Sequence, residues 1–360
     1  MENLFSPLHL GRGPEMKNRF MLAPLTNTQS HADGTLSDEE YHWLTMRAKG
    51  GFGLTMTCAA HVQARGQGFP GQLGIFSDDH LPGLTRLAAG INAENSVSIV
   101  QLHHAGNRSP AELIGQAPHC PSDDEETGAV GMTHAEVLDA IEAFIEGAVR
   151  AEKAGFHGVE LHGAHGYLIC QFLSSEINQR EDEFGGSLEN RARPLRMMID
   201  GIRERCGKDF ILGLRLSPER FGMDLGEIRD LAQSLMTEGK IDFLDMSLWD
   251  CFKLPNDERF QDRPLIGWFT DLNRHNVKLG VAGKIRTPAE AESVMAEGVD
   301  WIMLGRAAII HHDFPLQMQA NPDFQPLPNP VSRVHLAAEG LSEHFITYMG
   351  NWKGFVATEE

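Results

Sequence analysis

The stretch THAEVLDAIEAFIEGAVRAEKAGFHGVELH, residues Thr133–His162, contains one complete helix–strand unit. Thr133 followed by Glu136 is a capping box, because the hydroxyl can accept from the N–H three residues on while the carboxylate reaches back. Apolar residues then recur at helical spacing as far as Gly155, a residue that favours the end of a helix. The apolar run Gly158–His162 is typical of a strand covered on both faces. The stretch therefore predicts a helix that packs against a buried parallel strand.

The same alternation extends outward in both directions. Two further capping boxes, Ser37 with Glu40 and Thr287 with Glu290, predict helix starts. Eight strands are predicted, at Arg19–Pro24, Phe52–Thr57, Val97–Leu102, Gly158–His162, Phe210–Leu216, Ile241–Ser247, Val277–Ala282 and Val299–Leu304. Besides the helix after Glu136, helices are predicted over Asp38–Lys49, Leu81–Glu94, Leu188–Arg205, Glu227–Glu238, Leu265–His275 and Pro288–Glu297.

Eight strand–helix repeats predict an α/β fold, a single-domain (β/α)8 TIM barrel, because parallel neighbours need a crossover helix. A doubly wound open sheet is the alternative. One domain is expected over residues 1–360, with a C-terminal extension at about 314–360 that holds a short helix and an aromatic tail. Ala105–Gly131 reads as a long loop after the third strand.

Composition narrows the function. A net charge of −19 argues against nucleic acid as a partner, since this surface would repel a phosphate backbone. No apolar run reaches the roughly 18 residues of a membrane span, and the N-terminus lacks a signal-peptide pattern. The five widely spaced cysteines suit a reducing compartment and no metal or iron–sulfur framework. We therefore expect a cytoplasmic protein that works on small molecules.

In such a barrel the functional residues lie at the C-terminal ends of the strands. Most of the residues at the predicted ends can donate a hydrogen bond from a side chain or a glycine N–H. This arrangement suits a planar, polar heterocycle with a phosphate tail. The strand-end residues are Thr26, Ala59, Gln101, His162, Arg215, Ser247, Gly283 and Gly305.

The last two strand ends predict a phosphate site. Gly283 is followed by Lys284, and Gly305 by Arg306. Glycine lets the backbone approach a phosphate closely, and the following helix start favours negative charge. Two ordinary left-handed turn glycines are the alternative.

The segment HGAHGYL after the fourth predicted strand suggests a polar catalytic cluster. Two imidazoles three residues apart, His162 and His165, could hold a carbonyl or other oxyanion. Tyr167 is expected to be protonated at neutral pH and could act as a general acid. A structural role for each residue and metal ligation by the histidines are the alternatives.

Three further side chains are candidates for a cofactor. Arg215 could stabilise an anionic reduced flavin, unless it is simply paired with a buried acid. The amide of Gln101 can donate and accept at once, as a pyrimidine edge requires, or can merely close a strand end. Thr26 offers a hydroxyl to a flavin carbonyl.

Taken together, the motifs resemble the old yellow enzyme family of FMN-dependent NADH:flavin oxidoreductases and ene-reductases. The similarity runs from about Leu4 to Asp313. The matching segments are MKNRFMLAPLTN (Met16–Asn27), GFHGVELHGAHGYLICQFLSSEINQREDEFGGSLENRARP (Gly155–Pro194), GLRLSP (Gly213–Pro218), GKIRTPAEAE (Gly283–Glu292) and LGRA (Leu304–Ala307).

The resemblance implies a role for each matching position. FMN would be lined by Ala23, Pro24, Leu25 and Thr26, with Gln101 on the pyrimidine edge and Arg215 near N1 and C2=O. The FMN phosphate would be held by Gly283, Lys284, Gly305 and Arg306. His162 and His165 would bind the activating oxygen of an α,β-unsaturated carbonyl or nitro compound, and Tyr167 would protonate Cα. NADPH or NADH would be the reductant.

The chain departs from the family pattern at several positions. Cys58 stands where a Glu is expected, Lys284 where a second Gly is common, and Asn107 displaces Arg108 by one place, so that any role of this arginine is open. Tyr348 and Trp352 could cap a site in this chain or in a neighbouring subunit of a homo-oligomer, or could be ordinary tail packing.

The expected activity is reduction of activated C=C bonds. A flavin-binding redox module without turnover, or a quinone or nitro reductase without an ene-reductase role, is the alternative. A dienoyl-CoA reductase or amine dehydrogenase would need an iron–sulfur cluster and a second domain. A tRNA-modifying flavoenzyme is disfavoured by the net charge of −19.

Overall fold

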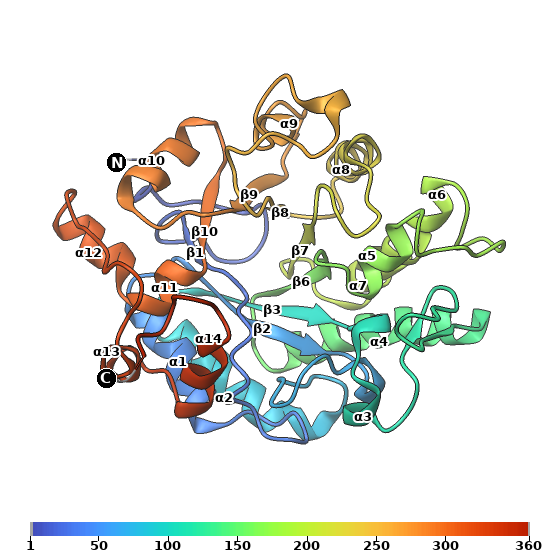
Figure 1. Ribbon diagram of the computed structural model, residues 1–360, viewed down its shortest axis with the longest axis horizontal. Helices are drawn as coiled ribbons and strands as arrows, with labels where there is room; N and C mark the ends of the chain where they lie inside the picture. Colours follow the sequence, from blue (N-terminus) through green and yellow to red (C-terminus); the bar gives the residue numbers. More distant parts are fainter. Residues whose placement is uncertain (1–2, 359–360) are drawn as a thin grey trace.

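Eight parallel strands close into a barrel in the computed structural model, which describes residues 3–358 (Figure 1). β1 pairs with both β2 and β10, so the ring has no open edge. This closure confirms the predicted (β/α)8 barrel and rules out the open sheet. The strands are β1 (Phe20–Leu22), β2 (Leu54–His61), β3 (Val97–His103), β6 (Gly158–Gly163), β7 (Ile211–Leu216), β8 (Phe243–Ser247), β9 (Lys278–Ala282) and β10 (Trp301–Leu304).

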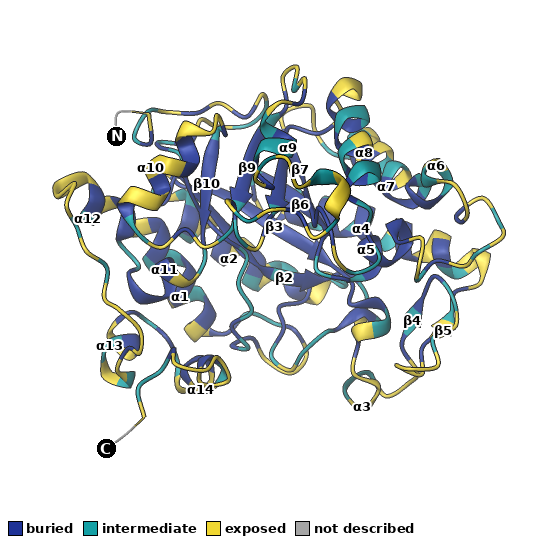
Figure 2. Ribbon diagram, turned by 45° about the horizontal axis from the view of Figure 1, so that its top comes forward, coloured by how far each residue is buried: buried dark blue, intermediate teal, exposed yellow. Residues whose placement is uncertain are grey.

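Helices surround the barrel, with buried inner faces and exposed outer faces (Figure 2). They are α1 (Asp38–Lys49), α2 (Leu81–Asn92), α3 (Ala111–Ile114), α4 (His134–Lys153), α5 (Leu168–Leu173), α6 (Leu188–Arg191), α7 (Arg193–Arg205), α8 (Leu225–Glu238), α9 (Gly267–Thr270), α10 (Pro288–Ala296), α11 (Arg306–Ile310), α12 (Phe314–Ala320), α13 (Arg333–Ala338) and α14 (Glu343–Gly350). Short 3-10 turns lie at Ala64–Gly66, Asp78–His80, Gly106–Arg108 and Glu258–Phe260.

Two helix predictions need correction. The helix predicted over Leu188–Arg205 is divided into α6 and α7, with Ala192 between them and Pro194 in the first turn of α7. A proline has no N–H to donate to the preceding turn, which favours a new helix start. Of the helix predicted over Leu265–His275, only the single turn α9 forms.

The capping boxes behave differently from one another. The boxes at Thr133 and Thr287 close reciprocally, as predicted. Ser37 accepts from the N–H of Glu40 at 3.0 Å, but no return bond forms. The Glu40 side chain is buried and instead accepts from Asn27 Nδ2 at 3.1 Å and from the thiol of Cys58 at 3.0 Å. This box is therefore only half formed, because a buried interaction takes its carboxylate.

The lower half of the barrel interior is apolar. Leu8 and Met16 form an antiparallel bridge in the segment before β1. Together with Leu10, this bridge packs against inward residues of the strands, among them Phe243 and Trp301, whose rings meet edge to face at 5.5 Å. The N-terminal segment therefore seals the barrel opposite the C-terminal ends of its strands.

The excursion between β3 and α4 contains α3 and a small parallel pair, β4 (His119–Cys120) with β5 (Val130–Gly131). Apart from the 3-10 turn at Gly106–Arg108, the remainder of Ala105–Gly131 is irregular, as the prediction of a long loop implied. Among residues 3–358, no helix is both long and apolar enough to cross a membrane.

After α12 the chain forms two short helices, α13 and α14, where the sequence predicted one, and Tyr348 belongs to α14 instead of a loose tail. In both ribbon views α14 lies beside α1 (Figures 1 and 2), and Phe345 meets Trp43 of α1 with ring centroids 5.3 Å apart. The C-terminal helices are therefore packed onto the barrel.

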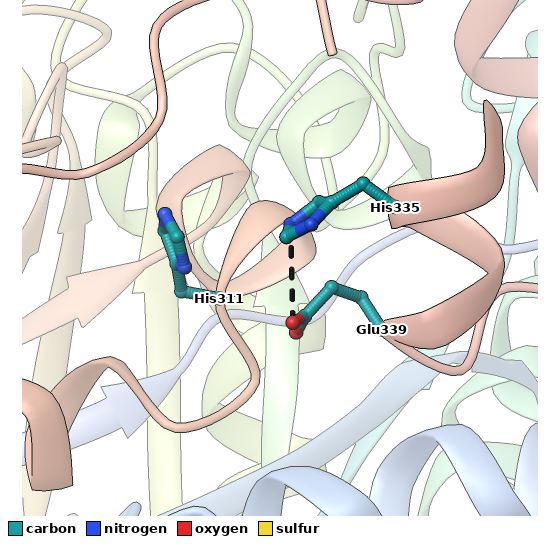
Figure 3. Close-up of side chains that lie close together, drawn as sticks. All are labelled: His311, His335 and Glu339. Atoms are coloured by element: carbon teal, nitrogen blue, oxygen red, sulfur yellow. Dashed lines mark ion pairs between the residues drawn. The ribbon is translucent and has the colours of Figure 1, made fainter. Parts of the chain in front are cut away.

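A cluster of His311, His335 and Glu339 joins this tail to the barrel (Figure 3). The N–H of Leu327 donates to His311 Nε2 at 2.9 Å, and His335 Nε2 lies 2.8 Å from the carbonyl oxygen of Ile310. Because backbone groups take one nitrogen of each imidazole, we describe the cluster as a fastening between the tail and the end of α11.

Candidate active site

A cavity of about 500 Å³ opens at the C-terminal ends of β1, β7, β8, β9 and β10. This volume is within the usual range for a pocket that binds a small molecule or cofactor. Most of the residues predicted to bind a cofactor line it, namely Ala23, Pro24, Leu25, Thr26, Arg215, Gly283, Lys284, Gly305 and Arg306, together with His165 from the predicted polar cluster.

One end of the cavity is cationic. Arg286 and Arg306 both line it, and no carboxylate in the described part of the chain pairs with either. Burial, and then the nearby charge of Arg286, lowers the pKa of Arg306 from its ordinary value. Lys284 differs, because its Nζ lies 2.8 Å from Asp250 Oδ2. The two arginines therefore provide an uncompensated anion site, of which the sequence predicted only Arg306.

The glycines at this end are not left-handed turn residues. Neither Gly283 nor Gly305 has a positive φ, whereas Lys284 has a φ of 52°. A Cβ at Gly305 would meet only Leu25 Cδ2, at 3.5 Å, so the backbone stays open to the cavity. A Cβ at Gly283 would come within 2.9 Å of the backbone N of Cys251. Gly283 is thus required for close packing as well.

The other end of the cavity carries the predicted His162, His165 and Tyr167. His162 lies 5.1 Å from His165 and 5.2 Å from Tyr167, measured between ring centroids. Only His165 lines the cavity as such. His162 is buried, and its Nδ1 has no hydrogen-bond partner among the described residues. The three rings do come together, as the spacing suggested.

Both imidazoles are held in the neutral form. Burial, and then the charges of Arg215 and Arg108, lowers the pKa of His165 to about 3. Burial also lowers the pKa of His162 well below its ordinary value. At neutral pH each ring therefore has one N–H to donate and one nitrogen that accepts.

Arg108, whose role was open, supports this cluster. Its guanidinium lies 4.7 Å from the centroid of the Tyr167 ring and donates to the carbonyl oxygen of His165. His103 contacts the same tyrosine edge to face, at 4.4 Å between centroids. Tyr167 is therefore held between a cation and an imidazole, and the residue as a whole is only partly buried.

Arg215 and Ser247 connect the two ends of the cavity. The Oγ of Ser247 lies 2.7 Å from His165 Nε2 and accepts from a terminal nitrogen of Arg215 at 3.3 Å. The Nε of Arg215 is buried without a partner among the described residues. The sequence predicts Ser247 only as a residue at a strand end. A side-chain hydroxyl at that position is the one sequence signal for a role in the site.

Two of the residues predicted to bind the cofactor lie outside the lining. Ala59 and Gln101 are neighbours in the pairing of β2 with β3. The amide Nε2 of Gln101 donates to Glu160 Oε1 at 2.7 Å, and the carbonyl oxygen of Ala59 accepts from Gln72. The carbonyl oxygen and the second N–H of the Gln101 side chain remain to meet a cofactor.

The tail supplies one wall of the cavity. Tyr348, Met349 and Trp352 line it, as does Trp249. Burial, then a side-chain hydrogen bond with Thr26 that acts against it, and the proximity of Tyr167 leave the pKa of Tyr348 raised above its usual value. Tyr348 and Trp352 thus contribute to the pocket of their own chain.

Backbone strain gathers at the same end of the barrel. Positive φ angles at residues other than glycine are uncommon, and such strain tends to concentrate at functional sites. His165 and Trp249 have φ angles of 62° and 65°. Residues with positive φ on this face are Thr28, His165, Arg220, Phe221, Trp249 and Lys284.

Comparison with known proteins identifies the family. Residues 3–323 match the model of the NADH:flavin oxidoreductase / NADH oxidase family. The chain is 34% identical to a probable NADH-dependent flavin oxidoreductase of Bacillus subtilis, over 88% of this chain and 87% of the relative.

Solved structures agree with this match. The old yellow enzyme homologue of Zymomonas mobilis superposes with a TM-score of 0.80 at 26% identity, covering 95% of this chain and 99% of the other. A morphinone reductase variant in complex with tetrahydroNAD superposes with a TM-score of 0.77 at 25% identity, covering 92% of this chain and 93% of the other.

The residues present fit FMN. Arg286 and Arg306, which have no carboxylate partner among residues 3–358, suit its phosphate. The buried nitrogens Arg215 Nε and His162 Nδ1, also without a partner in that range, suit a polar ring and its reaction partner. The chain therefore belongs to the NADH:flavin oxidoreductase / NADH oxidase family and is an FMN-dependent, NADH- or NADPH-using oxidoreductase of the old yellow enzyme type.

Proposed function

We propose that this protein reduces the activated C=C bond of α,β-unsaturated carbonyl compounds, and of related nitro compounds. The observation that carries the proposal is the meeting of two neutral imidazoles, His162 and His165, with the phenol of Tyr167 beside the cavity. A reaction that builds negative charge on one oxygen and needs a proton on carbon requires this set of groups.

The cofactor would be held by the lining residues. Ala23, Pro24, Leu25 and Thr26 would border its ring, with Gln101 and Arg215 on the pyrimidine side and Ala59 behind it. The phosphate would lie against Gly283, Gly305 and Arg306, with Lys284 nearby and Arg286 as an added cation. When bound, FMN supplies the hydride transfer from NADH or NADPH to the acceptor.

His162 and His165 would bind the carbonyl or nitro oxygen of the acceptor. As hydride adds to Cβ, negative charge develops on that oxygen, and preset N–H donors stabilise the charge where it appears. The neutral state matters because an imidazole N–H can donate without giving up its proton. The Ser247 hydroxyl, in contact with His165 Nε2, would hold the ring in place.

Tyr167 would deliver the proton to Cα. Arg108 lies over its ring and His103 against its edge, so the phenol has few ways to turn. Trp249, Tyr348 and Trp352 would keep water away from the acceptor. We propose that the whole chain, residues 1–360, works as one unit in the cytoplasm, a compartment that suits its five free cysteines.

The test is a half-reaction experiment. The holoenzyme is reduced anaerobically with NADPH, 2-cyclohexenone is added, and the visible flavin band is followed. We expect bleaching, then recovery of the band with one equivalent of saturated ketone. Bleaching without recovery by enones, but with recovery by quinones or aromatic nitro compounds, would replace the proposal with a reductase of those acceptors. Absence of bleaching by NADPH or NADH would point to a flavin module without turnover.

A further inference from the structure

A layer of polar side chains crosses the barrel interior just below the cavity. It consists of Gln101, Glu160, Arg215 and Asp245, none of which is more than 5% exposed. Side chains alternate along a strand, so Asp245, two residues after the inward Phe243, also points into the barrel. Gln101 pairs in register with Glu160, and Arg215 with Asp245. The layer therefore brings two carboxyl groups close to one guanidinium.

Two glycines make room for this layer. Gly280 is the register partner of Asp245, and a Cβ there would lie 2.4 Å from Asp245 Oδ1 and 2.2 Å from the Trp301 ring. Gly213 is the register partner of Glu160, and a Cβ there would lie 2.0 Å from the Phe243 ring. No other residue type fits at either position without displacing a buried side chain.

If both acids are ionised, the layer contains carboxylate oxygens that lack a well-placed hydrogen-bond donor among the described residues. Glu160 Oε1 accepts from Gln101, but Glu160 Oε2 and both oxygens of Asp245 have no partner with good geometry among the described residues. Two buried carboxylates that face each other would repel, and each unpaired oxygen would keep its desolvation cost. One proton held between the two acids removes the repulsion and supplies a donor.

The electrostatic surroundings of Asp245 also favour a proton on this pair of acids. Burial raises the pKa of Asp245 well above its usual range, and the charge of Glu160 raises it further. Arg215 and the indole N–H of Trp301 act in the opposite direction. Among the described residues, these are the groups that shift the pKa of Asp245, and the cluster of inward side chains next to it is apolar.

We propose that Glu160 and Asp245 share a single proton and that Asp245 is a positioning residue for the cofactor site. With one proton on the pair, the charges of Arg215 and the two acids sum to zero. A second negative charge would draw the guanidinium downward and oppose an anionic reduced cofactor. The role of Asp245 as a positioning residue rests on the position that we propose for Arg215 beside the cofactor. The shared proton does not rest on it.

The proton can be observed directly by infrared spectroscopy in H2O and D2O at pH 7. Glu40 is a second buried carboxyl group with a raised pKa, so the Glu40→Gln protein serves as the background. There we expect a band of a protonated carboxyl group that is lost in Asp245→Asn. It should be lost in Glu160→Gln as well, because the remaining acid then pairs with Arg215 as a carboxylate. A band that survives both substitutions overturns the shared proton.

The reduction potential of bound FMN gives an independent readout. Asparagine has nearly the shape of a protonated aspartic acid, so Asp245→Asn should change the oxidised-to-reduced ratio at pH 7 by less than tenfold, about 30 mV for two electrons. If Asp245 is ionised in the native protein, the substitution removes a negative charge and raises the potential by more than this, which overturns the proposal. The infrared result holds whether or not enones are substrates, so the two proposals fail separately.

Discussion

The two halves of the barrel interior differ in polarity and in what their side chains do. The lower half contains Leu8, Leu10, Met16, Phe243 and Trp301, which form one buried apolar cluster. The upper half contains imidazoles, a phenol, arginines and acids, and most of the barrel's buried polar atoms without a partner among residues 3–358 lie there, the Trp301 indole N–H of the lower half being an exception. Apolar packing stabilises the fold, whereas unpaired polar groups are costly unless a ligand satisfies them. Stability and chemistry are therefore assigned to opposite ends of the same strands.

The largest effect should come from the upper half. In Tyr167→Phe, the rate of enone reduction should fall about 10²- to 10⁴-fold, the usual contribution of a positioned general acid. Bleaching of the flavin by NADPH should hardly change, since that step needs no proton from Tyr167. Stopped-flow measurement of the two half-reactions checks this. Tyr41→Phe, on α1 beneath Arg86, is the matched control. Equal enone rates in the two variants would remove Tyr167 from the mechanism.

A substitution in the lower half should act on stability alone. Phe243→Ala should lower the free energy of unfolding by about 3–5 kcal/mol, because it leaves a cavity beside Trp301. Urea unfolding measures this, and the folded fraction should keep its enone activity within a few fold. Leu138→Ala, on the exposed face of α4, should cost about 0.5 kcal/mol or less. Loss of activity before unfolding would show that the two halves are coupled.

Lowering the pH should reduce the free energy of unfolding through buried histidines in the upper half of the barrel. Burial is the main cause that lowers the pKa of His61 to about 4 and of His104 to about 3, so both stay neutral in the folded protein. Below about pH 6.5 the unfolded chain binds protons that the folded one does not, and stability is lost as the pH falls toward 4.

Each such histidine contributes up to about 1.4 kcal/mol per pH unit in that window. Urea unfolding at pH 7, 6 and 5 should show the decline, and His61→Gln should make it shallower. A free energy of unfolding that stays level or rises between pH 6.5 and 5 would contradict the neutral imidazoles.

The smallest of these effects is a difference in FMN affinity between substitutions of two cations near the predicted phosphate site. Arg306→Gln should weaken FMN binding about 10- to 100-fold, the value of one charge-assisted hydrogen bond. Lys284→Gln should cost less than about fivefold, because Lys284 is already paired with Asp250 near the surface. Titration of apoprotein with FMN, followed by fluorescence, compares them. Equal losses would mean that Lys284 leaves Asp250 when phosphate binds.

Local signals in the sequence predicted most of the barrel. The strands and the capping boxes at Thr133 and Thr287 depend on nearby residues, so the sequence pattern was sufficient. The half-formed box at Ser37 depends on Glu40 meeting Asn27 and Cys58, which no local pattern reveals. The plug formed by the segment around Leu8 and Met16 is likewise a long-range contact.

Residue types at the strand ends predicted which residues gather at the site. They did not predict which of these side chains are already engaged by residues distant in sequence. Arg306 and His165 lie where the strand ends placed them. Gln101 has its amide nitrogen engaged by Glu160, and Lys284 is engaged by Asp250, because side chains distant in sequence reach them first. Arg286 and Arg108 were not assigned, since a cation on a loop has no periodic signal.

The wall formed by Tyr348, Met349 and Trp352 has a consequence for how this enzyme could diversify. These residues follow the last barrel helix and lie beyond the segment that matches the family model. The tail is fastened at His311, His335 and Glu339, outside the ring of strands. Insertions or exchanges in the tail can therefore reshape the room above the cofactor while the strands stay as they are. Acceptor selection could therefore change through the tail without any change in the residues that line the cavity from the strands.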